Sequence, residues 1–132
     1  MRIFIDTSAL IALADRSDQY HQRAKAFVQA ARAVEFHTST YILDETITRL
    51  RFTAGVQVAV KVAESLWESR LYQIHPVDQP IERAALAILK KFSDQRLSFT
   101  DCTTIALMDR VGLERIFAFD DDFRKVGYLL VP

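Results

Sequence analysis

The chain has 132 residues and a mass of 15.1 kDa, the size of one folded domain. Half of its residues are hydrophobic and it has only three glycines and three prolines, which excludes a low-complexity chain and argues against disorder. The 17 basic and 17 acidic residues give a net charge of zero, which excludes a surface that is basic throughout but leaves room for a local basic patch.

The single cysteine, Cys102, excludes an internal disulfide and a cysteine zinc cluster, and it favours a reducing compartment. No uncharged apolar run is long enough for a signal peptide, and none approaches the roughly 20 residues of a membrane span. We therefore expect a cytoplasmic protein with no membrane association.

Short apolar runs alternate with longer helical patterns along the chain. The apolar runs predict strands at residues 2–6, 34–38, 71–75, 115–119 and 128–131. A 3.6-residue apolar period or capping residues predict helices at 9–14, 19–32, 40–55, 56–70, 81–92, 101–112 and, briefly, 123–126. This alternation is typical of parallel strands joined by right-handed crossovers. We predict one domain over residues 1–132 with an α/β fold, a three-layer α/β/α sandwich around a short, mostly parallel sheet.

Acidic residues follow the predicted strands. Asp6 ends the first strand, and Asp120 ends the fourth and is followed by two more aspartates. Glu45 lies in the helix after the second strand, and Asp101 opens the helix before the fourth. Because ligands of open parallel sheets bind beyond the carboxyl ends of the strands, we expect these acids to face one cleft.

Clustered carboxylates repel one another, so each is pushed toward its protonated form unless a cation compensates the charge. A ligand set of oxygens without cysteine or a well-placed histidine favours Mg²⁺ or Mn²⁺ over zinc. Carboxylate-bound Mg²⁺ keeps several waters and commonly acts on phosphates.

A purely structural explanation competes with this interpretation. A single aspartate at a helix start is more often a cap than a ligand, but Thr7, Ser8, Ser98 and Thr100 offer hydroxyls that could cap instead. Glu45 cannot be a cap, yet an ion pair with Arg49 four residues later explains it equally well. Arg49 and Arg51 are in turn either phosphate contacts at the rim of the cleft or ordinary exposed residues of a helix face.

Four sequence motifs carry a family resemblance. They are Ile3-Phe4-Ile5-Asp6-Thr7-Ser8-Ala9-Leu10, Glu45 after Thr38-Ser39, Ser98-Phe99-Thr100-Asp101-Cys102, and Phe119-Asp120-Asp121-Asp122-Phe123. In this order and spacing they resemble the PIN-domain nucleases along the whole chain, in particular the VapC-like toxin ribonucleases of bacterial toxin–antitoxin pairs. The resemblance implies a parallel sheet flanked by helices, dependence on Mg²⁺ or Mn²⁺, cleavage of single-stranded RNA, a cognate antitoxin and a homodimer.

The resemblance also implies roles for individual residues. The catalytic and metal-binding acids would be Asp6, Glu45, Asp101 and Asp120, with Asp122 as an additional metal ligand. Ser8 and Thr100 would support these acids through their hydroxyls. Ala118 departs from the family, in which a small hydroxyl residue often stands two positions before the fourth acid. The choice between Asp120 and Asp122 as fourth ligand therefore stays open, and we expect Asp121 to turn outward and cap the short helix after it.

We therefore predict a metal-dependent endoribonuclease, a hydrolase of phosphodiester bonds, acting as the toxin of a toxin–antitoxin pair. The alternatives are a PIN nuclease that is not a toxin, a catalytically silent PIN-like binding module, and an Mg²⁺-binding phospho-acceptor signalling domain. The last would need a lysine after a late strand, whereas Phe119 is followed by three aspartates. We expect His37 and His75 to have surface or packing roles, and Trp67 to lie in the core or an interface.

Overall fold

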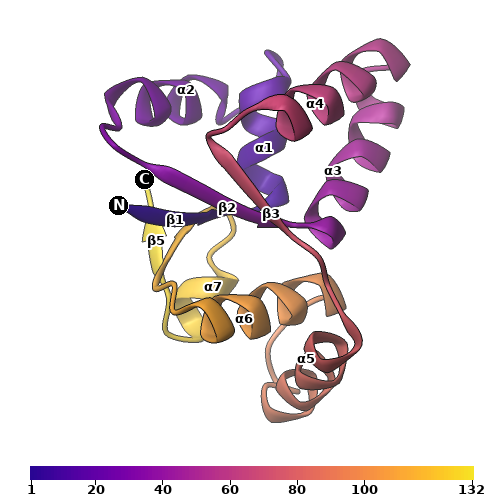
Figure 1. Cartoon of the computed structure of the whole chain (residues 1–132), viewed down its shortest axis with the longest axis vertical. Coiled ribbons are helices and arrows are strands. Elements are labelled where there is room, and N and C mark those ends of the chain that lie inside the picture. The colour runs from indigo at the N-terminus through magenta and orange to yellow at the C-terminus, as the bar shows by residue number, and fades with distance from the viewer.

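The computed structural model describes residues 1–132, and it alternates strands and helices along the whole chain (Figure 1). The strands are β1 (Arg2–Ile5), β2 (Glu35–Ser39), β3 (Tyr72–His75), β4 (Arg115–Phe117) and β5 (Leu129–Val131). The helices are α1 (Thr7–Ala14), α2 (His21–Ala30), α3 (Thr40–Thr53), α4 (Val56–Glu68), α5 (Gln79–Lys91), α6 (Phe99–Val111) and α7 (Asp122–Lys125). Every predicted element is present, with each end within two residues of its predicted position.

The five strands form one sheet in the order β3-β2-β1-β4-β5, and every neighbouring pair is parallel. The sheet is thus parallel throughout, where a mostly parallel one was predicted. Helices α1 to α4 cover one face and α5 to α7 the other, which confirms the three-layer sandwich (Figure 1). The chain runs from β1 outward to β3 and then returns to β4 on the other side of β1. The strand order therefore reverses between β1 and β4, the position at which open α/β sheets bind ligands.

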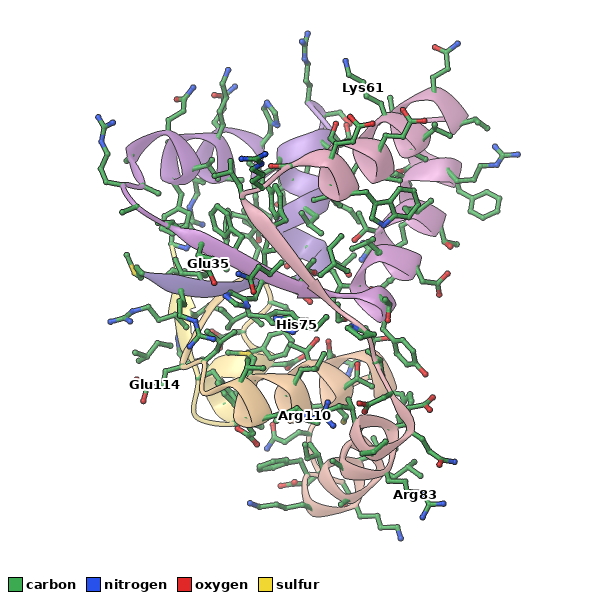
Figure 2. All side chains as sticks on the ribbon, in the orientation of Figure 1. Glu35, Lys61, His75, Arg83, Arg110 and Glu114 are labelled. Carbon is green, nitrogen blue, oxygen red and sulfur yellow. The ribbon has the colours of Figure 1, made fainter.

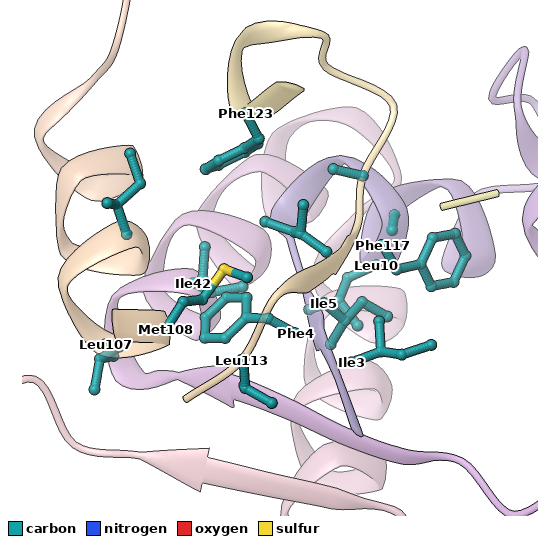
Figure 3. Close-up of a cluster of buried hydrophobic side chains, with 14 of the residues drawn as sticks. Ile3, Phe4, Ile5, Leu10, Ile42, Leu107, Met108, Leu113, Phe117 and Phe123 are labelled. Atoms are coloured by element: carbon teal, nitrogen blue, oxygen red, sulfur yellow. The ribbon is translucent and has the colours of Figure 1, made fainter. Parts of the chain in front are cut away.

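The hydrophobic core lies on both faces of the central strand. Ile3, Phe4 and Ile5 of β1 are fully buried, as expected for a strand covered by helices on both sides. Phe4 lies next to Met108 of α6 (Figure 3). On the opposite face, Phe117 of β4 packs against Phe27 of α2, with the ring centroids 4.7 Å apart. This packing fixes the strand ends from which the candidate site residues project.

Some apolar side chains remain outside the core. Trp67 of α4 is 63% exposed, so the core role considered for it is wrong and the interface role remains. Phe52, Val56 and Val60, from the end of α3 and from α4, are also exposed. None of the seven helices is both long enough and apolar enough to cross a membrane.

Candidate active site

Asp6 is the first residue after β1 and the N-cap of α1. Its backbone N–H donates to the carbonyl of Phe117 at 3.0 Å, which holds it against the end of β4. Its Oδ2 accepts hydrogen bonds from the backbone N–H of Ser8 at 3.3 Å and from the Ser8 hydroxyl at 2.9 Å. The expectation that the hydroxyls of Thr7 and Ser8 would relieve Asp6 of capping is therefore wrong. Asp6 stands at the N-cap position, and its own short polar side chain caps α1.

The Ser8 hydroxyl joins two parts of the site. Besides donating to Asp6, its Oγ accepts from the backbone N–H of Phe119 at 3.0 Å, across 111 residues of sequence. Ser8 thus supplies a hydroxyl next to Ala118, the position where the sequence lacks one. The supporting role predicted for Ser8 is confirmed. The supporting role of the Thr100 hydroxyl stays a prediction. The hydrogen bond found at this residue is one that its backbone carbonyl accepts from the Thr103 hydroxyl.

Asp101 lies in the first turn of α6. Its backbone N–H donates to the Ser98 hydroxyl at 3.0 Å, and its Oδ2 accepts from the Ser98 backbone N–H at 2.9 Å. These reciprocal bonds form a capping box, in which the N-cap is Ser98. Thr100, the expected cap of a helix from residue 101, lies inside α6, so that prediction is wrong. Asp101 therefore has a structural role through one oxygen and retains Oδ1 for other ligands.

Glu45 lies in the second turn of α3, which Ser39 caps by accepting from the backbone N–H of Ile42. Glu45 is 3.5 Å from Arg49, the ion pair considered as the alternative explanation for this residue. Both side chains are partly exposed, so the pair contributes little stability. The charge of Glu45 nevertheless acts on both Asp6 and Asp101, so the ion pair does not separate Glu45 from the other acids.

The three consecutive aspartates after β4 have different surroundings. Asp120 accepts a hydrogen bond from the backbone N–H of Asp122 at 3.0 Å, and Asp122 lies 3.7 Å from Lys125. Asp121 is exposed and pairs with Arg124 at 2.6 Å. It turns outward and occupies the N-cap position of α7 as predicted, but its side chain makes no capping hydrogen bond. Asp120 makes that contact instead.

The electrostatics connect the predicted acids. Burial, together with the charges of Asp101 and Glu45, raises the pKa of Asp6 to about 7, although its bonds from Ser8 act in the opposite direction. Burial also raises the pKa of Asp101, and the charges of Asp120 and Glu45 add to this effect. The pKa of Asp120 is raised by burial and by the neighbouring Asp122 charge. Asp6, Glu45 and Asp101 thus act on one another, Asp120 is linked to them through Asp101, and Asp122 is linked through Asp120.

The donor chemistry of these residues fits a hard divalent cation. The acids supply carboxylate oxygens, and the hydroxyl of Thr7 beside Asp6 is buried without a hydrogen-bond partner. No group of three or more histidine, cysteine, aspartate or glutamate side chains is arranged to hold a metal ion directly. This arrangement suits Mg²⁺, which commonly binds one or two carboxylates and keeps several waters. The set of metal ligands stays a prediction.

A hollow of about 360 Å³ adjoins the acids, and we call it the Gln19 hollow. Its walls come from α1, the turn before α2, α3 and the segment after β4. The residues that line it include Asp18, Gln19, Tyr20, Arg49, Phe119 and Asp120. Arg49, considered from the sequence as a phosphate contact, lines it, whereas Arg51 lies over the ring of Phe52. Gln19 and Tyr20 were not identified from the sequence, because they lie in a turn outside every acidic motif.

Two histidines in the neighbouring strands β2 and β3 form a separate network. His37 is buried in β2, and its Nε2 lies 2.6 Å from Glu35. Its Nδ1 lies 2.8 Å from Nε2 of His75 at the end of β3, and the two rings are stacked. Figure 2 labels Glu35 and His75, the two residues on either side of His37 in this network. Both histidines therefore have the packing role that was expected.

Comparisons with known proteins identify relatives of this chain. The PIN domain pattern matches residues 3–129. The 23S rRNA-specific endonuclease VapC20 of Mycobacterium tuberculosis is 33% identical over 129 residues, which cover 98% of this chain and 97% of that protein. Ribonuclease VapC26 of the same species is 27% identical over 89% of this chain and 86% of its own length.

Solved structures give the same result for the fold. The crystal structure of VapC20, described as a sarcin–ricin loop cleaving toxin, superposes with a TM-score of 0.90 at 31% identity over 96% of both chains. A toxin–antitoxin complex from Klebsiella pneumoniae has a TM-score of 0.68 at 19% identity, over 98% of this chain and 96% of that one, and supports the fold alone. With the PIN pattern spanning nearly every residue and a relative one-third identical along its whole length, this chain belongs to the PIN domain family.

Proposed function

We propose that this protein is a metal-dependent endoribonuclease, with Asp6, Glu45, Asp101 and Asp120 as its catalytic acids. The observation that carries the proposal is the chain of charge interactions that links Asp6, Glu45, Asp101 and Asp120 beside the point where the strand order reverses. VapC20, a relative of almost the same length, is a 23S rRNA-specific endonuclease, which supports RNA as the substrate. Single-stranded loops of ribosomal RNA are the substrates to test first.

The same acids, with Asp122, form the proposed Mg²⁺ or Mn²⁺ site, in which one or two of the carboxylates would bind the cation directly and the others would bind it through its waters. When bound, a divalent cation supplies positive charge at the scissile phosphate and activates water for attack. Ser8 holds Asp6 in position and keeps its pKa lower than burial alone would. Because the pKa of Asp6 is still about 7, protons compete with the cation near neutral pH, and cleavage should increase as the pH rises through this value.

We further propose that the protein is a toxin neutralised by a cognate antitoxin and that it forms a homodimer. A second, mostly apolar hollow of about 440 Å³ lies between α1 and α4 and includes Leu10, Leu13, Val58 and Val62. Arg16 and Lys61 also line it, so an amphipathic antitoxin helix with acidic flanks would complement it. The solved structure of the relative VapC20, described as a toxin, supports a toxin role and hence such a partner. Light scattering of the free protein tests whether it is a dimer. We expect a Val62→Glu variant to lose antitoxin binding if the antitoxin helix occupies this second hollow.

The decisive experiment measures cleavage of single-stranded RNAs, including a sarcin–ricin loop oligonucleotide, by the purified protein. We expect cleavage with Mn²⁺ or Mg²⁺, none with EDTA, and at least a tenfold loss in Asp101→Asn. Cleavage that persists in EDTA, or in a folded Asp101→Asn protein, would contradict the proposed site. Expression without the antitoxin should arrest growth, and harmless expression of an active wild type would indicate a nuclease that is not a toxin.

A further inference from the structure

The Gln19 hollow shares a wall with the catalytic acids. Asp120 lines the hollow directly, and the hydroxyl of Ser8, also on its wall, binds the Asp6 carboxylate. An RNA strand with its scissile phosphate at the acids must therefore pass the mouth of this hollow. Its volume of about 360 Å³ lies within the range of small-molecule sites, about 300–1,000 Å³.

Aromatic side chains form one side of the hollow. The rings of Tyr20 and Phe119 stack in parallel with their centroids 4.5 Å apart. The guanidinium of Arg23 lies beside this pair, 5.9 Å from the Tyr20 centroid and 5.4 Å from that of Phe119. Both rings are only half-buried and so retain apolar surface against which a base can pack.

The turn that carries Tyr20 and Gln19 is fixed before any ligand binds. Asp18 accepts from the backbone N–H of Tyr20 at 2.8 Å, and its carbonyl accepts from the N–H of His21 at 3.1 Å. The ring of His21 is in turn 2.7 Å from the carbonyl of Ala12 in α1. A ligand of the hollow therefore orders little backbone on binding, which favours affinity.

The polar groups that line the hollow differ in the part of a nucleotide that they attract. Arg49 is a cation on α3 and suits a phosphate. Asp18 carries acceptor oxygens that repel phosphate but accept hydrogen bonds from amino groups, whereas Asp120 has its proposed role among the catalytic acids. Gln19 is exposed and offers both an amide donor and an acceptor. A base with an exocyclic amino group satisfies these acceptors, and uracil has none.

We propose that the Gln19 hollow holds the nucleobase adjacent to the scissile phosphate, prefers a base with an exocyclic amino group, and places a neighbouring phosphate on Arg49. This inference rests on the proposed ribonuclease function and specifies how the same site selects its substrate. Gln19 is then a specificity residue that contacts RNA without taking part in bond cleavage.

The test combines protein variants with altered RNAs. After the cleaved bond is mapped, each flanking nucleotide is replaced in turn by an abasic one or by uridine, and kcat and KM are measured. We expect one flanking position at which base removal raises KM about tenfold for the wild type. Gln19→Ala should raise KM about fivefold on intact RNA with kcat within twofold, and should have no further effect on the abasic RNA.

Two matched variants control for general effects. Gln22→Ala removes an exposed amide in the first turn of α2, three residues after Gln19, and Arg51→Gln removes an exposed cation of α3 that does not line the hollow. Both should keep the wild-type KM, whereas Arg49→Gln should weaken binding of intact and abasic RNA alike. Gln19→Glu retains an acceptor and should keep the preference for an amino base.

The outcomes separate this inference from the function on which it rests. If the wild type cleaves no RNA, the ribonuclease proposal fails and the inference fails with it. If the wild type cleaves RNA but Gln19→Ala responds to every altered RNA as the wild type does, the inference alone is overturned. Unchanged cleavage by Gln19→Ala with a loss of antitoxin affinity would assign the hollow to the protein partner and would equally overturn it.

Discussion

Replacing Asp6 by asparagine should stabilise the metal-free protein while it inactivates the enzyme. Asp6 is only 6% exposed, and its pKa is raised from 3.8 to about 7. At pH 8 the folded protein must therefore keep a charge that burial and the neighbouring acids oppose. Asparagine has nearly the same shape without this charge.

The local structure should tolerate the change. Both hydrogen bonds from Ser8 go to a single oxygen of Asp6, Oδ2, which the amide oxygen of asparagine can replace. Asparagine is also as good an N-cap as aspartate. The amide NH₂ would then occupy the position of Oδ1 and could donate to a neighbouring carboxylate instead of repelling it.

The magnitude follows from the pKa. At about 1.4 kcal/mol per pKa unit, the rise from 3.8 to about 7 corresponds to an upper limit of about 4 kcal/mol. We expect a gain in unfolding free energy of about 2–4 kcal/mol at pH 8, or roughly 7–14 °C in Tm for a chain of this length.

The gain in unfolding free energy of Asp6→Asn should depend on pH. Because the folded state of the wild type binds the Asp6 proton more tightly than the unfolded state, its stability decreases as the pH rises from about 4 through about 7. The advantage of Asp6→Asn should therefore vanish below pH 4 and be complete above pH 7. Urea denaturation in EDTA at pH 4, 6 and 8 measures both.

Asp15 is a matched control for this experiment. It also accepts from the backbone N–H and hydroxyl of a serine two residues later, Ser17, but it is more exposed and these bonds lower its pKa. Asp15→Asn should therefore leave stability at pH 8 unchanged or reduced, the opposite of Asp6→Asn. A lower Tm for Asp6→Asn than for the wild type at pH 8 would refute the account of Asp6 as a buried, repelled charge.

Three further predictions concern the rest of the site. In Asp101→Asn, the rate of cleavage should fall at least tenfold, while the Tm in EDTA should stay within about 3 °C of the wild type. The amide oxygen can still accept from Ser98, and a repulsive charge is removed. A large drop in Tm would instead favour a mainly capping role for Asp101. Ser8→Ala loses two hydrogen bonds and should cost about 1–3 kcal/mol in urea denaturation, and the pH profile of cleavage should move to higher pH; an unmoved profile would separate Ser8 from Asp6. Mn²⁺-dependent cleavage should fall at least tenfold in Asp120→Asn, stay near wild type in Asp121→Asn and lie between them in Asp122→Asn, and an active Asp120→Asn with an inactive Asp122→Asn would reverse the assignment.

The sequence by itself was sufficient for the secondary structure and for the family to which the chain belongs. The apolar run of β1 is continuous because both faces of that strand are covered, and the capping serine of α6 is a local signal that precedes its helix directly. Such features depend on residues a few positions apart, so they can be read without knowledge of the fold. The order of the four acidic motifs likewise carried the family resemblance, which the match over residues 3–129 confirmed.

Tertiary structure alone decided how these residues act on one another. The parallel pairing of β1 with β4 places the segment after Phe117 against Asp6, and only then can the Ser8 hydroxyl accept from Phe119. The raised pKa of Asp6 and the Gln19 hollow also need contacts between distant segments. Burial and Coulomb interactions depend on distances in space, and a sequence specifies those distances only after strands far apart in the chain have paired.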